Sequence, residues 1–184
     1  MKPLDALTIL ELGDSLAVRY AGRLFAGCGA RVVRRAEGSV EIGYGGEAGR
    51  AYAAWLDAGK EIAPAADEAF DAVIVDADAD LSGVPAGALR VDVSWFDRDG
   101  PYAGWAGSDG VIQALSGAAY GFGEPDGPPV VAQGNAPSVM AGVTAAIAAL
   151  AGLIGRRRGQ GPQRIGLNVL EAALCITEGG PIAH

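Results

Sequence analysis

The stretch LTILELGDSLAVRYAGRLFAGCGARVVRRAE, Leu7–Glu37, decides the expected fold. Leu7–Leu12 is a short apolar run with β-branched residues, and it ends at a Gly-Asp-Ser turn, which is typical of a strand. In Leu16–Gly27 apolar residues recur every four positions, so the segment predicts a helix with one apolar face. Ala30–Glu37 then predicts a second strand. Strand, helix and strand in about 30 residues form a βαβ unit, whose strands are parallel and whose crossover is right-handed.

The rest of the pattern extends this unit into an α/β domain. Runs of Val and Ile predict buried parallel strands at Asp71–Asp76 and Ala88–Phe96, and Arg164–Leu170 predicts one more. Helices are expected around Tyr52–Leu56, in SDGVIQALSGAAY with Ser108 or Asp109 as cap, from about Ser138 to Arg156, and in EAALCI; Gly38–Gly49 is expected to be an exposed loop. We therefore expect one domain over residues 1–184, with a Rossmann-like parallel sheet of four or five strands and helices on both faces.

The charge balance excludes one class of partner. The formal net charge is −8, so the surface would repel a phosphate backbone, and no nucleic-acid partner is expected. The one basic run, Arg156–Arg158, ends the long predicted helix, where cations stabilise the negative end of the helix dipole. We interpret this run as structural and not as a polyanion site.

The single histidine excludes several kinds of site. It is His184, the last residue, so no Ser-His-Asp triad, Cys-His pair or His-based metal site is expected. Cys28 and Cys175 lack C-x-x-C spacing and lie in apolar helical surroundings, which predicts two buried thiols and no metal site. No signal-peptide pattern is present, and the longest uncharged apolar run, Val139–Ile154, is short for a membrane helix. We expect a cytoplasmic protein that does not enter the membrane.

The acidic residues give no clear site. A nucleotide site of the G-x-G-x-x-G kind is not expected, because the first turn, GDSLAV, has one glycine where three are needed. Glu37, at the end of the second strand, is then an exposed structural residue, and the direction of Asp92 stays open. Four further acids are expected to be solvated and to bind no metal: Asp71, Asp76, Asp78 and Asp80.

Ser138 lies where the loop VVAQGNAP passes into the long predicted helix. Two roles are open, a helix cap and a nucleophile. A serine hydroxyl needs a base to become nucleophilic, and the chain has no histidine to supply one. We therefore favour the cap, in which the Ser138 hydroxyl accepts from a first-turn N–H.

Three stretches resemble the class III CoA-transferases, a family that includes formyl-CoA transferases, carnitine CoA-transferases and α-methylacyl-CoA racemases. Order and spacing agree from Pro3 to about Leu174. The stretches are PLDALTILELGDSLAVRYAGRLFAGCGARVVRRAEG, DRDGPYAGWAGSDGVIQALSGAAYGFGEPDGPPV and RRRGQGPQRIGLNVLEAAL. The second is similar to the family's GxxGPYxxxxGYDxxxQAxSGLxxxTGxPDGPPV and is the most specific of the three.

The resemblance implies a fold and a mechanism. The fold is the Rossmann-like large domain of the family, which binds acyl-CoA near its first strand turn and forms interlocked dimers. The mechanism begins when an aspartate at the mouth of the long helix attacks the thioester and forms an acyl anhydride. With no gap in the alignment, this aspartate falls on Ser138, which cannot form the anhydride.

Other positions of this sequence either match the motifs of the family or differ from them. Ser15, Leu16 and Ala17 match the segment beside the pantetheine, and Lys60 matches the lysine of the family's NRGK motif. The family's Arg after the third strand is absent, and its acid-arginine pair after the second strand is replaced by Ala36-Glu37. Trp95 stands where the family usually has Gly, close to the acyl site. Family members are also considerably longer, with a second domain and a glycine-rich loop that this sequence lacks.

Three functions follow as hypotheses. The first is a degenerate subunit that binds CoA or acyl-CoA as ligand, without a permanently bound cofactor, in a homo-oligomer or with a catalytic CoA-transferase homologue. The second is an active CoA-transferase or acyl-CoA racemase completed by a partner chain. The third is an unrelated nucleotide-binding Rossmann domain.

Overall fold

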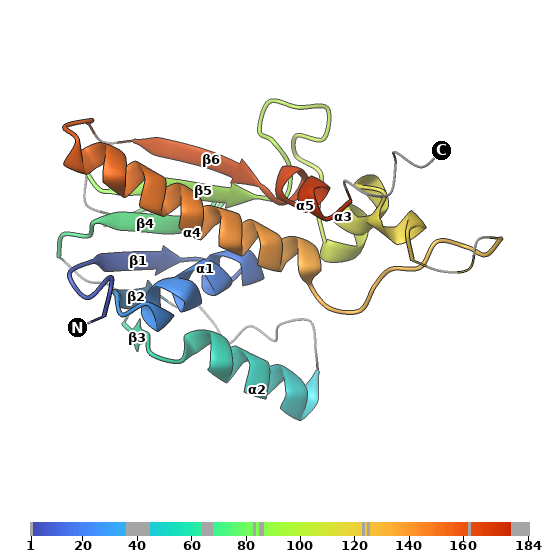
Figure 1. Ribbon diagram of the computed structural model, residues 1–184, viewed down its shortest axis with the longest axis horizontal. Coiled ribbons are helices and arrows are strands. Elements are labelled where there is room, and N and C mark those ends of the chain that lie inside the picture. The colour runs from blue at the N-terminus through green and yellow to red at the C-terminus, as the bar shows by residue number, and fades with distance from the viewer. Residues whose placement is uncertain are drawn as a thin grey trace.

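The structure of the protein is a computed structural model. It describes residues 2–35, 45–63, 68–82, 84, 87–122, 124, 126–161 and 163–177, and at positions 176 and 177 it describes the backbone alone. Its centre is a six-stranded parallel sheet in the order β3-β2-β1-β4-β5-β6 (Figure 1). The strands are β1 (Thr8–Leu12), β2 (Arg31–Arg35), β3 (Glu61–Ile62), β4 (Ala72–Asp76), β5 (Leu89–Ser94) and β6 (Arg164–Asn168). The helices are α1 (Leu16–Gly27), α2 (Gly46–Asp57), α3 (Asp109–Leu115), the short 3-10 helix η1 (Ala118–Tyr120), α4 (Ala136–Arg157) and α5 (Val169–Thr177).

Most predicted elements are confirmed. The α/β class and the parallel sheet are as expected, and α1 has the predicted bounds. Ser108 caps α3, since its Oγ accepts from Val111 N at 3.3 Å. Glu37 and His184, and the part of the predicted loop from 38 to 44, lie outside the described residues.

Two predictions about elements were wrong. The sheet has six strands and not four or five, because β3 has only two residues and no sequence periodicity can mark it. Gly46–Gly49 was expected in a loop but forms the first turn of α2. That helix is held by tertiary contacts that the local sequence does not show, among them Leu56, which is fully buried and packs with Leu16.

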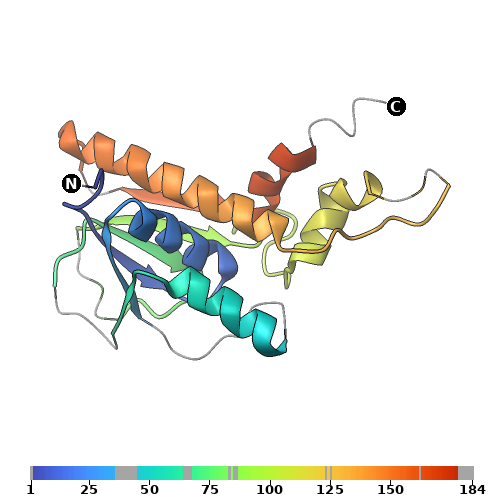
Figure 2. The same cartoon turned by 60° about the horizontal axis from the view of Figure 1, so that its bottom comes forward.

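The main core lies between α1, α4, α5 and one face of the sheet. Figure 2 shows α1 and α4 on the same face of the sheet, with the segment from α3 to the start of α4 projecting past the strand ends. The helices approach closely because their contact residues are small: a Cβ on Gly142 would lie 2.7 Å from Ala17 O and 2.8 Å from Tyr20 Cβ. The opposite face of the sheet has its own apolar cluster of Leu10, Leu12, Val33, Phe70, Val73 and Val75.

The two crossovers of this sheet have opposite hands. The chain leaves β1, passes through α1 and enters β2 on one side of β1, whereas it leaves β5, passes through α4 and enters β6 toward the opposite edge. Because α1 and α4 pack together on one face, only one crossover can be right-handed. Figure 1 assigns the common right hand to β1-α1-β2, as the sequence predicts.

α4 is the core helix of the domain. By length and composition it could cross a membrane, the one such helix in the described part of the chain. Many of its residues are nevertheless buried within the domain: Pro137, Ser138, Ala141, Gly142, Ala145, Ala146, Ala149, Gly152, Leu153 and Gly155. The alanines and Leu153 of this set belong to the main core, which accounts for part of the apolar composition of the helix.

The prediction of buried thiols was wrong. Cys28 and Cys175 are both exposed. Cys28 is the C-cap residue of α1 and lies past the buried stripe of that helix, and Cys175 is on an outward position of α5. Apolar neighbours in sequence do not decide burial when the helix places a residue on its outer face.

Gly142→Ala is expected to lower the free energy of unfolding by about 1 to 2 kcal/mol, because the new methyl group would meet the backbone oxygen of Ala17. The gain in helix propensity, about 1 kcal/mol, offsets only part of the clash. Urea denaturation measures the difference. Gly155→Ala is the matched control, since the group nearest its added Cβ is the flexible end of Gln160, and this variant should be at least as stable as the wild type. Equal losses in both variants would contradict the close-packing argument.

Candidate functional site

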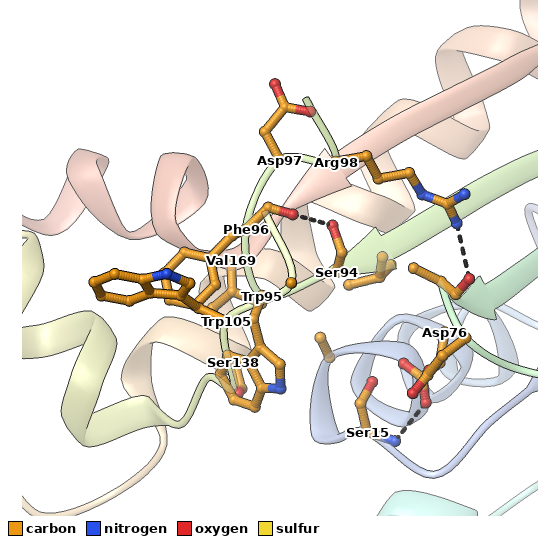
Figure 3. Close-up of a pocket in the computed structure, with 15 residues that line it drawn as sticks. Ser15, Asp76, Ser94, Trp95, Phe96, Asp97, Arg98, Trp105, Ser138 and Val169 are labelled. Atoms are coloured by element: carbon orange, nitrogen blue, oxygen red, sulfur yellow. Dashed lines mark hydrogen bonds between the residues drawn. The ribbon is translucent and has the colours of Figure 1, made fainter. Parts of the chain in front are cut away.

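The candidate site lies at the carboxyl ends of the central strands. The strand order reverses between β1 and β4, and open α/β sheets bind ligands in the crevice at such a point. A cavity of about 450 Å³ is present there. Its lining comes from the turn after β1, the ends of β4 and β5, the segment after β5, and the starts of α4 and α5: Ser15, Ala17, Asp76, Ala77, Asp78, Val93, Ser94, Trp95, Phe96, Asp97, Arg98, Gly104, Trp105, Ser138 and Val169 (Figure 3).

One wall of the cavity is polar and rigidly built. Ser15 N donates to Asp76 Oδ2 at 2.9 Å, and the Ser15 hydroxyl caps α1 by accepting from Val18 N at 3.3 Å (Figure 3). Gly13 has φ +107°, and a Cβ there would overlap the Asp76 carboxylate. Burial raises the pKa of the Asp76 carboxyl, and hydrogen bonds from Ser15 and Asp14 act in the opposite direction. Asp76 is half-buried and bridges β4 and the first turn, which corrects the expectation of a solvated acid.

The opposite wall is apolar and aromatic. Trp95, Phe96 and Trp105 line it, and Figure 3 shows them on the side of the cavity away from Ser15 and Asp76. Tyr102 packs against the ring of Phe96 at 5.6 Å between centroids and edge-on against Trp105 at 5.1 Å. Gly107 is required beside this wall, because a Cβ there would overlap the Trp95 side chain. The wall suits an apolar ligand chain.

Ser138 lies in the first turn of α4 and lines the cavity, but it is not a helix cap. The N-cap position is Asn135, which makes no side-chain cap bond. The Ser138 hydroxyl donates to Asp109 Oδ2 at 2.8 Å, and Ser138 N donates to Asp109 Oδ1 at 2.9 Å. The prediction of a cap was wrong, and the hydroxyl has an acceptor that is not a histidine. The acceptor comes from α3, 29 positions earlier, and the sequence marked Asp109 only as a possible cap of its own helix.

The residues expected beside the pantetheine have different surroundings. Ser15 and Ala17 line the cavity, whereas Leu16 is buried against Leu56 of α2. The side chain of Lys60 is fully buried, and its Nζ donates to Glu11 Oε2 at 2.6 Å and to Arg19 O at 2.8 Å. Contact between Lys60 and CoA stays a prediction, and it would require this arrangement to open.

Lys60 belongs to a buried ion cluster, which we define as Glu11, Asp14, Arg19, Arg34, Asp57 and Lys60. Arg34 lies at the centre, with contacts of 3.1 Å to Glu11, 2.6 Å to Asp14 and 3.4 Å to Asp57. Arg19 Nη2 donates to Asp57 Oδ2 at 2.9 Å and to Ala53 O at 3.3 Å, so the cluster ties the end of α2 to α1, β1 and β2. The cluster has three acids and three bases, and each of these groups has a neighbour of the opposite kind.

Burial dominates the protonation of the central pair. It raises the pKa of the Glu11 carboxyl to about 7, with Lys60 and then Arg34 acting in the opposite direction. It also lowers the pKa of the Lys60 ammonium, against the attraction of Glu11. Gly22 of α1 makes room for the pair, because a Cβ there would overlap Glu11 Oε2.

The charged groups at the cavity mouth give it a negative balance. The exposed acids Asp78 and Asp97 line it together with one exposed cation, Arg98, whose Nη2 donates to Ala77 O at 2.8 Å. The mouth therefore does not attract the phosphates of an anionic ligand.

The remaining acids are held by local partners. Asp92 is 4% exposed and pairs with Arg90 and Arg164, which settles its direction. Asp71 accepts from Thr8 N at 2.9 Å, and the Ser82 hydroxyl lowers the pKa of Asp80. In the described part of the chain no three His, Cys, Asp or Glu side chains form a metal-binding group.

Comparisons of the sequence and of the structure find similar proteins. A family model described as CoA-transferase family III matches residues 87–184. The succinate–glutarate CoA-transferase of Agrobacterium fabrum is 27% identical over an alignment of 210 residues. The alignment covers 95% of this chain and 52% of that protein. A hypothetical protein of Mycobacterium tuberculosis has a similar structure, with a TM-score of 0.77 and 19% identity over 100% of this chain and 58% of that one. A CAIB/BAIF family protein of Brucella suis also has a TM-score of 0.77, with 23% identity over 98% of this chain and 57% of that one.

The chain spans little more than half the length of these relatives. The structural likenesses, all below 25% identity, support the fold, and the match to the family model covers more than half of the present chain.

The Glu11 carboxyl makes the stability of the ion cluster depend on pH. The pKa of this carboxyl is about 7 in the fold, against an ordinary value of 4.5. Its contribution to the free energy of unfolding is therefore fully present below pH 4.5 and is lost as the pH rises through 7. The difference corresponds to roughly 3 kcal/mol. The stability advantage of the wild type over Glu11→Gln is therefore expected to shrink from pH 5 to pH 8, measured by urea denaturation at both values.

Glu124→Gln, a change at an exposed acid, is the control and should show no such trend. An advantage of the wild type that grows between pH 5 and pH 8 would mean that the ionised pair is favoured in the fold.

Proposed function

The chain belongs to CoA-transferase family III, and from this premise we propose that it binds CoA or acyl-CoA without supplying the carboxylate nucleophile itself. The observation that carries the proposal is the cavity at the carboxyl ends of β1, β4 and β5, which has Ser138, and no free acid, at the mouth of α4. The match to the family model sets aside the hypothesis of an unrelated nucleotide-binding domain.

The shape and chemistry of the cavity support binding of part of an acyl-CoA. A volume of about 450 Å³ is within the range of small-ligand pockets but is small for a whole CoA. The aromatic wall of Trp95, Phe96 and Trp105 favours the thioester end and the acyl chain. The negative balance at the mouth disfavours the nucleotide phosphates, so these groups would lie outside this cavity.

The hydrogen bonds of Asp109 support the loss of the nucleophile. In the family resemblance the attacking carboxylate falls on Ser138, and a hydroxyl cannot form an acyl anhydride with the same chemistry. Asp109 brings a carboxylate next to this position, but Ser138 donates to both of its oxygens and Asp109 does not line the cavity. Asp109 also makes a poor base for the hydroxyl, because a carboxylate is a much weaker base than an alkoxide.

A second candidate is an active CoA-transferase or acyl-CoA racemase completed by a partner chain. It is favoured by exposed apolar side chains around the entry to α4: Val111, Leu115, Tyr120, Phe122, Val130 and Val131. Such a surface suits a homo-oligomer or a hetero-oligomer with a catalytic homologue. In either case we propose a single domain over residues 1–184, a cytoplasmic location and no permanently bound cofactor.

Isothermal titration with CoA, and with succinyl-CoA as the acyl probe suggested by the name of the Agrobacterium relative, tests the binding. Trp105→Ala is expected to weaken binding about three- to tenfold, because it removes an aromatic face from the cavity wall. Trp55→Ala is the matched control, since Trp55 is also exposed but lies on α2, away from the cavity. Binding of NAD or ATP with no binding of CoA would reject the proposal.

A turnover assay distinguishes the two candidates. The purified chain is expected to give no transfer of CoA to succinate or glutarate, and Ser138→Ala should leave ligand binding within about threefold, since it removes one hydroxyl. Transfer by the purified chain that is abolished in Ser138→Ala would show that the residue is catalytic. Transfer that arises only when a co-purifying homologue is added would favour completion by a partner.

A further inference from the structure

The segment 132–138, which leads into α4, is held at both ends by one face of α3. Gln113 Oε1 accepts from Ala132 N at 2.9 Å, and Gln113 Nε2 donates to Ala132 O at 3.3 Å. Asp109 accepts from both the backbone N–H and the hydroxyl of Ser138. Asp109 and Gln113 are four positions apart, so they lie on the same face of the helix, one turn from each other.

The two anchors supply hydrogen bonds that the segment does not make with its own side chains at the start of α4. Asn135, at the N-cap of α4, makes no side-chain cap bond, and the first-turn N–H groups of a helix need acceptors. Asp109 supplies one from another helix, and its negative charge lies near the positive end of the α4 dipole. Gly134, with φ +95°, lets the chain turn between the anchors. Gln113 and Ser138 are 2% and 3% exposed, so both anchor bonds are shielded from water.

We propose that α3 is a two-point clamp on the segment 132–138, and that Asp109 and Gln113 are positioning residues for the cavity. The clamp sets where Ser138 lies relative to the opposite wall of Ser15 and Ala17, because α4 enters the cavity through its first turn. The link between the clamp and CoA rests on the proposed function; the clamp itself does not.

The clamp also fixes the polarity of the Ser138 hydroxyl. A hydroxyl has one proton and two lone pairs, and this proton is donated to Asp109 Oδ2. The group therefore has only lone pairs to offer to a ligand, which must meet it with a donor such as an amide N–H. Asp109→Asn places an amide there, which can present its N–H to the hydroxyl and release the hydroxyl proton.

Hydrogen exchange on the ligand-free protein tests the clamp directly. Asp109→Ala and Gln113→Leu are each expected to raise the exchange rate of the amides of residues 138–141 about tenfold, with exchange in β1, β4 and β5 unchanged. Ser108→Ala is the matched control, because it removes the cap of the same helix, at Val111 N, without touching the segment 132–138. A uniform loss of protection over the whole domain, or no change at residues 138–141, would overturn the clamp.

Titration with CoA tests the consequence for the cavity. Asp109→Ala is expected to weaken binding at least tenfold, Gln113→Leu by a similar factor and Ser108→Ala by less than twofold. Asp109→Asn keeps an acceptor for Ser138 N, so it should restore both the protection at residues 138–141 and the affinity for CoA to within about threefold of the wild type. If Asp109→Ala does not fold, Gln113→Leu decides the result. A wild type that does not bind CoA refutes the proposed function and leaves the exchange experiment to judge the clamp; equal CoA affinity in all variants refutes the positioning role.

Discussion

The close approach of α1 and α4 is the constraint on which the site depends. Both helices lie on one face of the sheet and meet through small residues, with Gly142 against the backbone of Ala17. Since both begin at the carboxyl edge of the sheet, their contact brings the first turn of α1 next to the first turn of α4. Ala17 and Ser138 therefore line one cavity, although 121 positions separate them in the sequence numbering. A larger side chain at this contact would separate the two walls.

The buried ion cluster fixes the other side of the domain. Its six side chains come from β1, β2, α1 and the region of α2, and the central pair of Glu11 and Lys60 is fully buried. Charges buried in this way are costly unless each has a partner, which makes the cluster specific for one arrangement of α2 on α1. The arrangement uses the Lys60 ammonium as a structural group and places the polar atoms of Lys60 away from solvent.

Asp109 of α3 binds both the hydroxyl and the backbone N–H of Ser138. A serine at the mouth of a helix suggests a cap, and in the fold Ser138 is not the cap. It is a donor to a carboxylate from α3, with its backbone N–H held by the same residue. The acid thus stabilises the start of α4 from outside the helix, in place of the unused cap position at Asn135.

The sequence by itself determined the α/β class, the bounds of α1 and the positions of the longer strands, because hydrophobic periodicity and turn residues are local signals. The similarity of its motifs also identified the family. It did not determine β3, the first turn of α2 or the exposure of Cys28, since these depend on contacts between distant segments. Nor could it show that Asp76 bridges to the first turn or that Asp109 binds Ser138. Those hydrogen bonds join residues 61 and 29 positions apart, and only the packing of the helices on the sheet brings their atoms together.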